Sequence, residues 1–332
     1  MRSDWTALPE SVTAAIAERV GGTFDVAQAS SGDHAEIAST VRGPAGPIFI
    51  KAASGELSVR SLRYEVAVTR ADRHPPAVLW QFESDGWLVV GTEHLAGPHP
   101  DLSPGSTDLN LLLAALKALQ ETPAPGETWF TPATRLGFAH PAMDGETLIH
   151  TDLNPANLIV TPLGLPIVDW AWATKAAAWV ELALLVPWLI GSGHSAEQAE
   201  EWIAQLPAWT ATDRQVLNDF ASKNATKWAA KSRQNTERWV RDLAMWTGEW
   251  AHHRTDGHQP AREPQRGGTL SLMWAPATVK LLNQPAGPLG TANQFTQPGR
   301  SMAARTENQP RCSQSAPNVS HTYRKARYRQ LR

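Results

Sequence analysis

The chain has 332 residues, of which 42% are hydrophobic and 19% charged, a composition typical of a globular protein with one large or two ordinary domains. No apolar run is long enough to cross a bilayer, we expect no signal peptide, and the single cysteine excludes an internal disulfide, so a cytoplasmic location is the default expectation. The formal net charge of −2 hides an asymmetry, because eight of the 30 Lys and Arg residues but only one of the 32 acids lie from residue 300 onward.

The first third of the chain predicts one helix, a set of strands and a second helix. Gly21 and Gly22 follow the first helix candidate, and Asp85-Gly86 is a strong hairpin-turn dipeptide between two strand candidates. The expected order is helix 9–20, strands 23–29, 35–41 and 48–52, helix 56–73, and strands 77–82 and 87–92.

The later part of the chain is dominated by helix patterns. We expect a helix at 109–119, a buried helix at 182–190, short strand pieces at 148–149 and 167–168, and a helix whose face carries Trp239, Leu243, Trp246 and Trp250 as core packing. Strands followed by helices indicate an α+β fold of two lobes. We place a small antiparallel-sheet N-lobe at 1–95, a mostly helical C-lobe at 96–285, and a disordered basic tail at 286–332.

Residues 148–160 contain the pattern His-x-Asp-x-x-x-x-Asn between apolar flanks, formed by His150, Asp152 and Asn157. Asp169 follows twelve residues after Asn157, within another apolar segment. This spacing is that of the catalytic loop and the metal-binding aspartate of kinases, so the segment predicts phosphoryl transfer.

Each residue type suits a step of that chemistry. The Asp152 carboxylate can accept the proton of an attacking hydroxyl. Asp169 and Asn157 supply the hard oxygen ligands that Mg²⁺ prefers. We expect His150 to brace the loop backbone, whereas Asn154 either orients the loop or only forms its turn.

The upstream half predicts a clamp for a nucleotide. Lys51, on the strand at 48–52, is expected to reach the phosphates, and Glu65 in the next helix is expected to hold this lysine as an ion pair, with Glu56 as the rival partner. The hairpin tip Ser30-Ser31-Gly32 is expected to cover the phosphates with backbone N–H groups. The adenine edge would bond to the backbone of Glu93 and Leu95, where the strand at 87–92 leaves the small lobe.

With these motifs, the chain resembles the aminoglycoside phosphotransferase and choline kinase family, which has a protein-kinase-like fold. The resemblance covers about residues 20–275 and includes Val168-Asp169-Trp170, in which the pair Asp169-Trp170 stands in place of the protein-kinase Asp-Phe-Gly. It implies ATP or GTP as donor, two Mg²⁺ ions, and a small-molecule hydroxyl as acceptor. The chain has Glu181-Leu182-Ala183 where the family commonly has Asp-Leu-Ala, and its C-terminal end departs from the usual ordered helix.

The partner of such an enzyme is a small molecule. The part of the chain before residue 300 is acidic, which favours a cationic acceptor such as an aminoglycoside, another antibiotic or an amino-alcohol. Asp242 and Glu249 are candidate contacts for it. The same acidity also suits simple solubility. We expect neither nucleic acid nor membrane as a partner, although the basic run Arg324-Lys325-Ala326-Arg327 leaves either contact open beside an ordinary solvated tail. The alternative function is a nucleotide-binding regulatory protein without transfer activity, against which the presence of Asp152 speaks.

Overall fold

The computed structural model describes residues 3–28, 35–72, 76–124, 126 and 130–256. Its N-lobe is a five-stranded antiparallel sheet in the order β1-β2-β3-β5-β4. The strands are β1 (Asp25–Gln28), β2 (Ile37–Gly43), β3 (Gly46–Ala53), β4 (Val78–Ser84) and β5 (Trp87–Glu93). Because β3 lies at the centre, between β2 and β5, the residues it carries are held from both sides.

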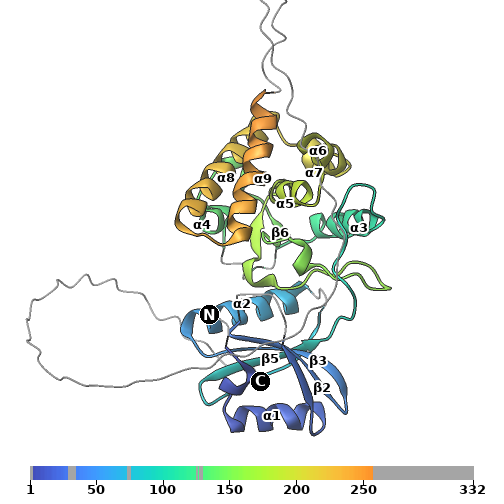
Figure 1. Ribbon diagram of the computed structural model, residues 1–332, viewed down its shortest axis with the longest axis vertical. Helices are drawn as coiled ribbons and strands as arrows, with labels where there is room; N and C mark the ends of the chain where they lie inside the picture. Colours follow the sequence, from blue (N-terminus) through green and yellow to red (C-terminus); the bar gives the residue numbers. More distant parts are fainter. Residues whose placement is uncertain (1–2, 29–34, 73–75, 125, 127–129, 257–332) are drawn as a thin grey trace, which may run out of the picture. The chain divides into compact units, whose positions relative to one another are not determined.

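Two helices cover the opposite faces of this sheet (Figure 1). Helix α1 (Glu10–Val20), preceded by the short 3-10 helix η1 (Trp5–Ala7), buries Val12, Ile16 and Val20 in a cluster with residues of β2, β3 and β5. Helix α2 (Glu56–Asp72) packs Leu62 and Val66 on the other face. The sheet thus has an apolar layer on each side, and α2 faces the C-lobe.

The C-lobe is mostly helical and carries a two-stranded sheet. Its helices are α3 (Asp108–Gln120), α4 (Pro132–Leu136), α5 (Trp179–Gly191), α6 (Ala196–Ile203), α7 (Pro207–Thr210), α8 (Arg214–Gln234) and α9 (Arg238–Asp256), with the 3-10 helices η2 (Pro141–Met143), η3 (Pro155–Asn157) and η4 (Trp170–Trp172). Strand β6 (Thr147–Ile149) pairs with β7 (Thr174–Ala176). Helices α8 and α9 pack side by side, and α5 lies against α9.

Helix α2 connects the cores of the two lobes. Its Tyr64 and Val68 belong to the C-lobe core cluster, and the Tyr64 hydroxyl donates to the carbonyl of Ala173 at 2.5 Å. The chain between β5 and α3 is held as well, because Val160 N donates to the Pro98 carbonyl and Gly97 packs so closely on the Val160 carbonyl that a Cβ would clash there. These contacts fix the lobes on either side of the catalytic-loop segment.

The α+β fold and the expected order of elements in the first lobe are confirmed. Asp85 and Gly86 both have positive φ, 46° and 79°, as a tight hairpin turn requires. The buried helix expected at 182–190 lies within α5.

One predicted strand piece is wrong. Residues 167–168 form only an isolated bridge, Leu158↔Ile167, extended by hydrogen bonds from Val168 N to the Asn157 carbonyl and from Ile159 N to the Pro166 carbonyl. Pro166 has no N–H to donate, so the ladder is interrupted at that residue. The strand piece expected at 148–149 is confirmed, since it lies in β6, which pairs with β7.

Across the described ranges, no helix combines the length and the apolar character needed to span a membrane. The expected tail at 286–332 lies outside the described residues, as does the hairpin tip Ser30-Ser31-Gly32.

Candidate active site

A cleft of about 1060 Å³ lies between the sheet of the N-lobe and the helices of the C-lobe. It gathers side chains from both halves of the sequence. Among its lining residues are Lys51, Glu65, Glu93, Leu95, Asp152, Asn154, Asn157 and Asp169. Gln28 and Ala35, which lie on either side of the hairpin tip, line it too.

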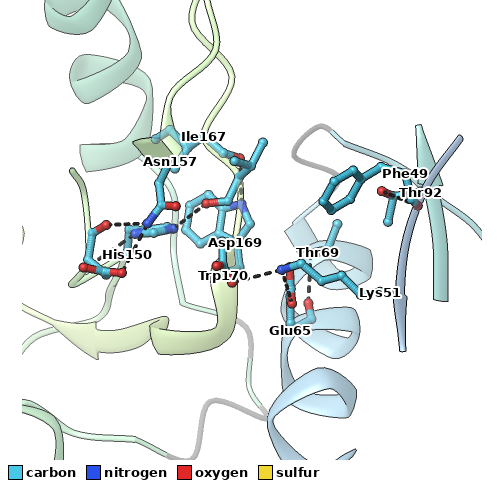
Figure 2. Close-up of polar contacts among 12 residues, drawn as sticks. Phe49, Lys51, Glu65, Thr69, Thr92, His150, Asn157, Ile167, Asp169 and Trp170 are labelled. Atoms are coloured by element: carbon cyan, nitrogen blue, oxygen red, sulfur yellow. Dashed lines mark hydrogen bonds and ion pairs between the residues drawn. The ribbon is translucent and has the colours of Figure 1, made fainter. Parts of the chain in front are cut away.

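Lys51 joins the two lobes across this cleft (Figure 2). Its Nζ lies 2.7 and 2.9 Å from the two carboxylate oxygens of Glu65 and 3.0 Å from Oδ1 of Asp169. The three side chains are only 13–15% exposed. Burial opposes the charge of Lys51, but the two carboxylates outweigh it and raise the pKa of this lysine, so the ammonium is positively charged. Glu56, the rival partner, lines a different cavity beside Arg60 and Arg63.

His150 lies beneath the cleft and does not line it. The imidazole is fully buried, its Nε2 lies 2.9 Å from the Val168 carbonyl, and its Nδ1 accepts a hydrogen bond from Asp152 N at 3.3 Å. Its ring packs edge-on against Trp170 with centroids 4.9 Å apart. Burial lowers the pKa of His150 to about 4, so the ring is neutral and ties the catalytic loop to the segment before Asp169. These contacts hold the backbone of the predicted catalytic loop.

The Asp152 carboxylate is surrounded by amide donors. Asn157 Nδ2 lies 3.2 Å from Oδ2 of Asp152 and 2.8 Å from its carbonyl, and Asn154 Nδ2 lies 3.3 Å from Oδ1. Asn154 Oδ1 also accepts from Ala156 N, capping η3. Asn154 thus both forms the turn and contacts the carboxylate, which unites the two interpretations of this residue.

Two non-glycine residues of the site have left-handed backbones. Thr151 has φ 62° and Asp169 has φ 65°. A β-branched residue rarely adopts this conformation, and it persists only where surrounding contacts hold it. The hydroxyl of Thr151 donates to the Trp172 carbonyl at 2.6 Å, and its N–H donates to Oε2 of Glu181 at 3.1 Å.

Glu181, on α5, holds the catalytic loop from below. Its Oε2 accepts the N–H groups of His150 and Thr151, whereas its Oε1 is buried and has no hydrogen-bond partner among the described residues. Burial raises the pKa of Glu181 to about 7, although both N–H donors favour the charged form. The structural role expected for this departure from Asp-Leu-Ala is thus a contact to the loop that carries Asp152.

We expect Glu181→Gln to flatten the pH dependence of stability. The native protein keeps the Glu181 proton between pH 4.5 and 7, where the unfolded chain releases it, so this residue makes the free energy of unfolding fall as pH rises through that window, by about 3 kcal/mol. Glutamine keeps an acceptor oxygen and cannot ionise. Urea denaturation across this window should therefore show the difference between wild type and variant shrinking or reversing as pH rises. The exposed Glu18→Gln should follow wild type, and parallel curves for Glu181→Gln would contradict the assignment.

Asp169 and Asn157 fit a magnesium–nucleotide complex. Because the Asn157 amide nitrogen is engaged with Asp152, its Oδ1 is the atom left to bind a cation beside the Asp169 carboxylate. Mg²⁺ in nucleotide enzymes is typically held by one or two such oxygens together with phosphates and waters. The described residues contain no cluster of three or more His, Cys, Asp or Glu side chains that would hold a metal without a nucleotide.

One wall of the cleft was not predicted from the sequence. Asn224, Lys227, Trp228 and Lys231 of α8 line it at spacings of three and four, the signal of a single helix face. Trp239 of α9, expected in the core, is 43% exposed and lines the cleft, a correction to that prediction; Leu243 and Trp250 are buried.

The two acids considered for an acceptor do not line the cleft. Asp242 lies 3.5 Å from Arg238 on the same helix, and Glu249 is exposed. The hypothesis that they face a cationic ligand is therefore not supported by their positions.

The chain is similar to known phosphotransferases both by a family model and by solved structures. The model of the phosphotransferase enzyme family matches residues 112–214, the segment with the catalytic loop and Asp169. No curated protein matches the chain. Among solved structures, aminoglycoside phosphotransferase APH(4)-Ia with AMP-PNP and hygromycin B is 16% identical, with a TM-score of 0.52 over 76% of this chain and 100% of that one.

A second solved structure is choline kinase LicA from Streptococcus pneumoniae, which is 14% identical, with a TM-score of 0.50 over 74% of this chain and 99% of that one. At such low identity, the structural similarity to these two proteins shows a shared fold. Together with the family model, it confirms the resemblance that the motifs predict: this chain has the fold of the aminoglycoside phosphotransferases and choline kinases and resembles that family.

Proposed function

We propose that the protein transfers the γ-phosphoryl group of ATP or GTP to a hydroxyl of a small molecule. The observation that carries this proposal is the ion-pair cluster in which Lys51 contacts both Glu65 and Asp169 inside the cleft. A buried cation held between a helix carboxylate and a metal-binding aspartate is the arrangement that kinases use around nucleotide phosphates.

The nucleotide would occupy the cleft from the sheet to the catalytic loop. Lys51 would contact the phosphates, with Glu65 keeping its ammonium in place. At the outer end, Glu93 and Leu95 line the cleft where the chain leaves β5, so their backbone groups are available to the base. The hairpin tip Ser30-Ser31-Gly32 stays the expected cover of the phosphates.

Asp152 would orient the acceptor hydroxyl and accept its proton. The acceptor oxygen forms a bond to the γ-phosphorus, the bond from that phosphorus to the β,γ-bridging oxygen breaks, and the nucleoside diphosphate leaves. Asn154 and Asn157 hold the Asp152 carboxylate in position through their amide groups. Mg²⁺ bound by Asn157 and Asp169 would neutralise the charge of the phosphates.

The family resemblance suggests an aminoglycoside, another antibiotic or an amino-alcohol, and hygromycin B appears with one of the similar structures. The fold and the cleft support a small-molecule alcohol in general. The reaction would take place in the cytoplasm, where ATP is plentiful.

A coupled assay of nucleoside diphosphate release tests the proposal. Wild type with ATP, Mg²⁺ and an acceptor panel should release ADP in an acceptor-dependent manner, and Asp152→Ala should not. If ATP binds but no acceptor stimulates its consumption, the protein is the nucleotide-binding regulator considered as the alternative.

A further inference from the structure

The wall of the cleft formed by α5, α8 and α9 has its own chemistry. Asn224, Lys227, Trp228 and Lys231 stand at i, i+3, i+4 and i+7 of α8, so all four lie on one face of that helix. This face continues the cleft that contains Asp152. Since the N-lobe and the catalytic loop supply the groups proposed for the nucleotide, this wall is available to the acceptor.

The charge of this wall is positive. Lys227 and Lys231 both line it, and of the described residues that α5, α8 and α9 contribute to the cleft, none is an aspartate or glutamate. Burial lowers the pKa of Lys227 to about 8, and the charge of Lys231 acts in the same direction. Two lysine side chains on one wall, to which the described residues of α5, α8 and α9 contribute no carboxylate, form a site that an anion would stabilise.

The tryptophan side chains of the wall already contact a lysine ammonium of this chain. The rings of Trp228 and Trp239 meet edge to face, with centroids 5.8 Å apart. An aromatic pair of this kind attracts an ammonium group. Here, however, Nζ of Lys231 lies 4.6 Å from the Trp228 centroid and 4.9 Å from the Trp239 centroid. The Lys231 ammonium therefore occupies the place over the two rings that a cationic ligand would otherwise take.

A buried polar atom faces the same wall. Asn224 is 1% exposed, and its Oδ1 has no hydrogen-bond partner among the described residues. An unpaired buried acceptor is costly, so it points to a donor that arrives with a ligand. A hydroxyl group is such a donor.

We propose that the acceptor is a hydroxyl-bearing anion, a small molecule whose carboxylate or phosphate group binds Lys227 and Lys231 while a hydroxyl contacts Asn224 and its body packs on the tryptophan pair. This inference rests on the proposed function for the identity of the reaction, but it concerns a different set of side chains. The expected charge of the acceptor is opposite to the one that the acidic part of the chain before residue 300 favours, because nearby charges in a cleft outweigh distant ones that salt screens.

Binding measurements test this inference without requiring transfer. Protein with Mg²⁺ and a non-hydrolysable ATP analogue is titrated by calorimetry with three groups of probes. These are the anions gluconate and glucose 6-phosphate, the neutral sugar glucose, and the cations choline and hygromycin B. We expect at least one anion to bind more tightly than glucose and both cations, and the two anions distinguish a carboxylate ligand from a phosphate ligand.

The double variant Lys227→Gln/Lys231→Gln should weaken anion binding by about ten-fold or more, because each charge-assisted contact is stronger than a neutral one. Arg233→Gln is the matched control, since it removes one positive charge from α8 outside the cleft. It should leave anion binding unchanged. The single variant Lys231→Gln, at an exposed position, serves if the double variant fails to fold.

Three results would overturn the inference: anions that bind the double variant as well as wild type, tighter binding of choline or hygromycin B than of any anion, or no binding of either anion at millimolar concentration. Failure of the proposed function looks different. If an anion binds in a lysine-dependent manner but no phosphoester forms, the acceptor inference stands and the transfer activity does not. If choline or hygromycin B is phosphorylated and anions neither bind nor react, the transfer activity stands and the inference of an anionic acceptor is wrong.

Discussion

Replacing Asp152 with asparagine should reduce kcat by about 10²–10⁴-fold while the Kd for ATP stays within about three-fold of wild type. The substitution keeps the size of the side chain and removes its ability to accept a proton. Lys51 contacts Glu65 and Asp169, and the substitution leaves these three side chains unchanged. Steady-state kinetics with an active acceptor and calorimetry with ATP and Mg²⁺ measure the two quantities separately.

The control for Asp152→Asn is Asn154→Ala, which removes an amide that contacts the carboxylate but leaves the carboxylate itself. It should lower kcat less than Asp152→Asn does. An equal loss of ATP affinity and of kcat in Asp152→Asn would contradict the role of Asp152, because it would place this residue in nucleotide binding.

Lys51→Ala should impair both nucleotide binding and stability. Without the ammonium, the carboxylates of Glu65 and Asp169 face each other with no cation between them in a site that is about 15% exposed. Breaking a buried pair in this way typically costs about 3 kcal/mol or more, and removal of a charge-stabilising group from a site of phosphoryl transfer typically lowers kcat by about 10²-fold or more. Urea denaturation and ATP titration measure the two effects.

The Arg63–Glu83 pair supplies the comparison for Lys51→Ala. Its N–O distance of 2.7 Å is as short as that of Lys51 and Glu65, but its side chains are 58% and 61% exposed. Arg63→Ala should cost less than about 1 kcal/mol and leave ATP binding intact. Adding Glu65→Gln to Lys51→Ala should recover part of the lost stability. If Lys51→Ala and Arg63→Ala destabilise the protein equally, the buried cluster does not have the energetic role assigned to it.

Much of the candidate site could be predicted because its residues lie in short segments with their own signals. The spacing of His150, Asp152 and Asn157 reflects one loop, and a single loop keeps its residues close together whatever surrounds it. Lys51 and Glu65 could be paired because a strand followed directly by a helix leaves few alternatives. The choice between Glu65 and Glu56 depended on which turn of α2 faces the cleft. Glu65 lies on that turn, whereas Glu56 lines a different cavity.

The wall of the cleft formed by α5, α8 and α9 could not be predicted in the same way. The spacing of Asn224, Lys227 and Lys231 indicates one helix face, but it does not say what that face meets. Likewise, the aromatic stripe of α9 has the period of a core face. Trp239, near the start of that helix, instead packs against Trp228 of α8 and stays 43% exposed, so only the packing of α8 against α9 places it at the cleft. Side chains that depend on how distant helices meet need the tertiary structure.

Phosphorus NMR of the reaction mixture tests the central claim most directly, namely that Lys51, Asp152, Asn157 and Asp169 form one site of phosphoryl transfer. Wild type with ATP, Mg²⁺ and the full set of anionic, neutral and cationic acceptors should produce a new phosphomonoester resonance together with ADP. Asp152→Asn should bind ATP and produce neither. Spectra in which wild-type protein, shown to bind ATP, forms no phosphomonoester with any acceptor would contradict the account.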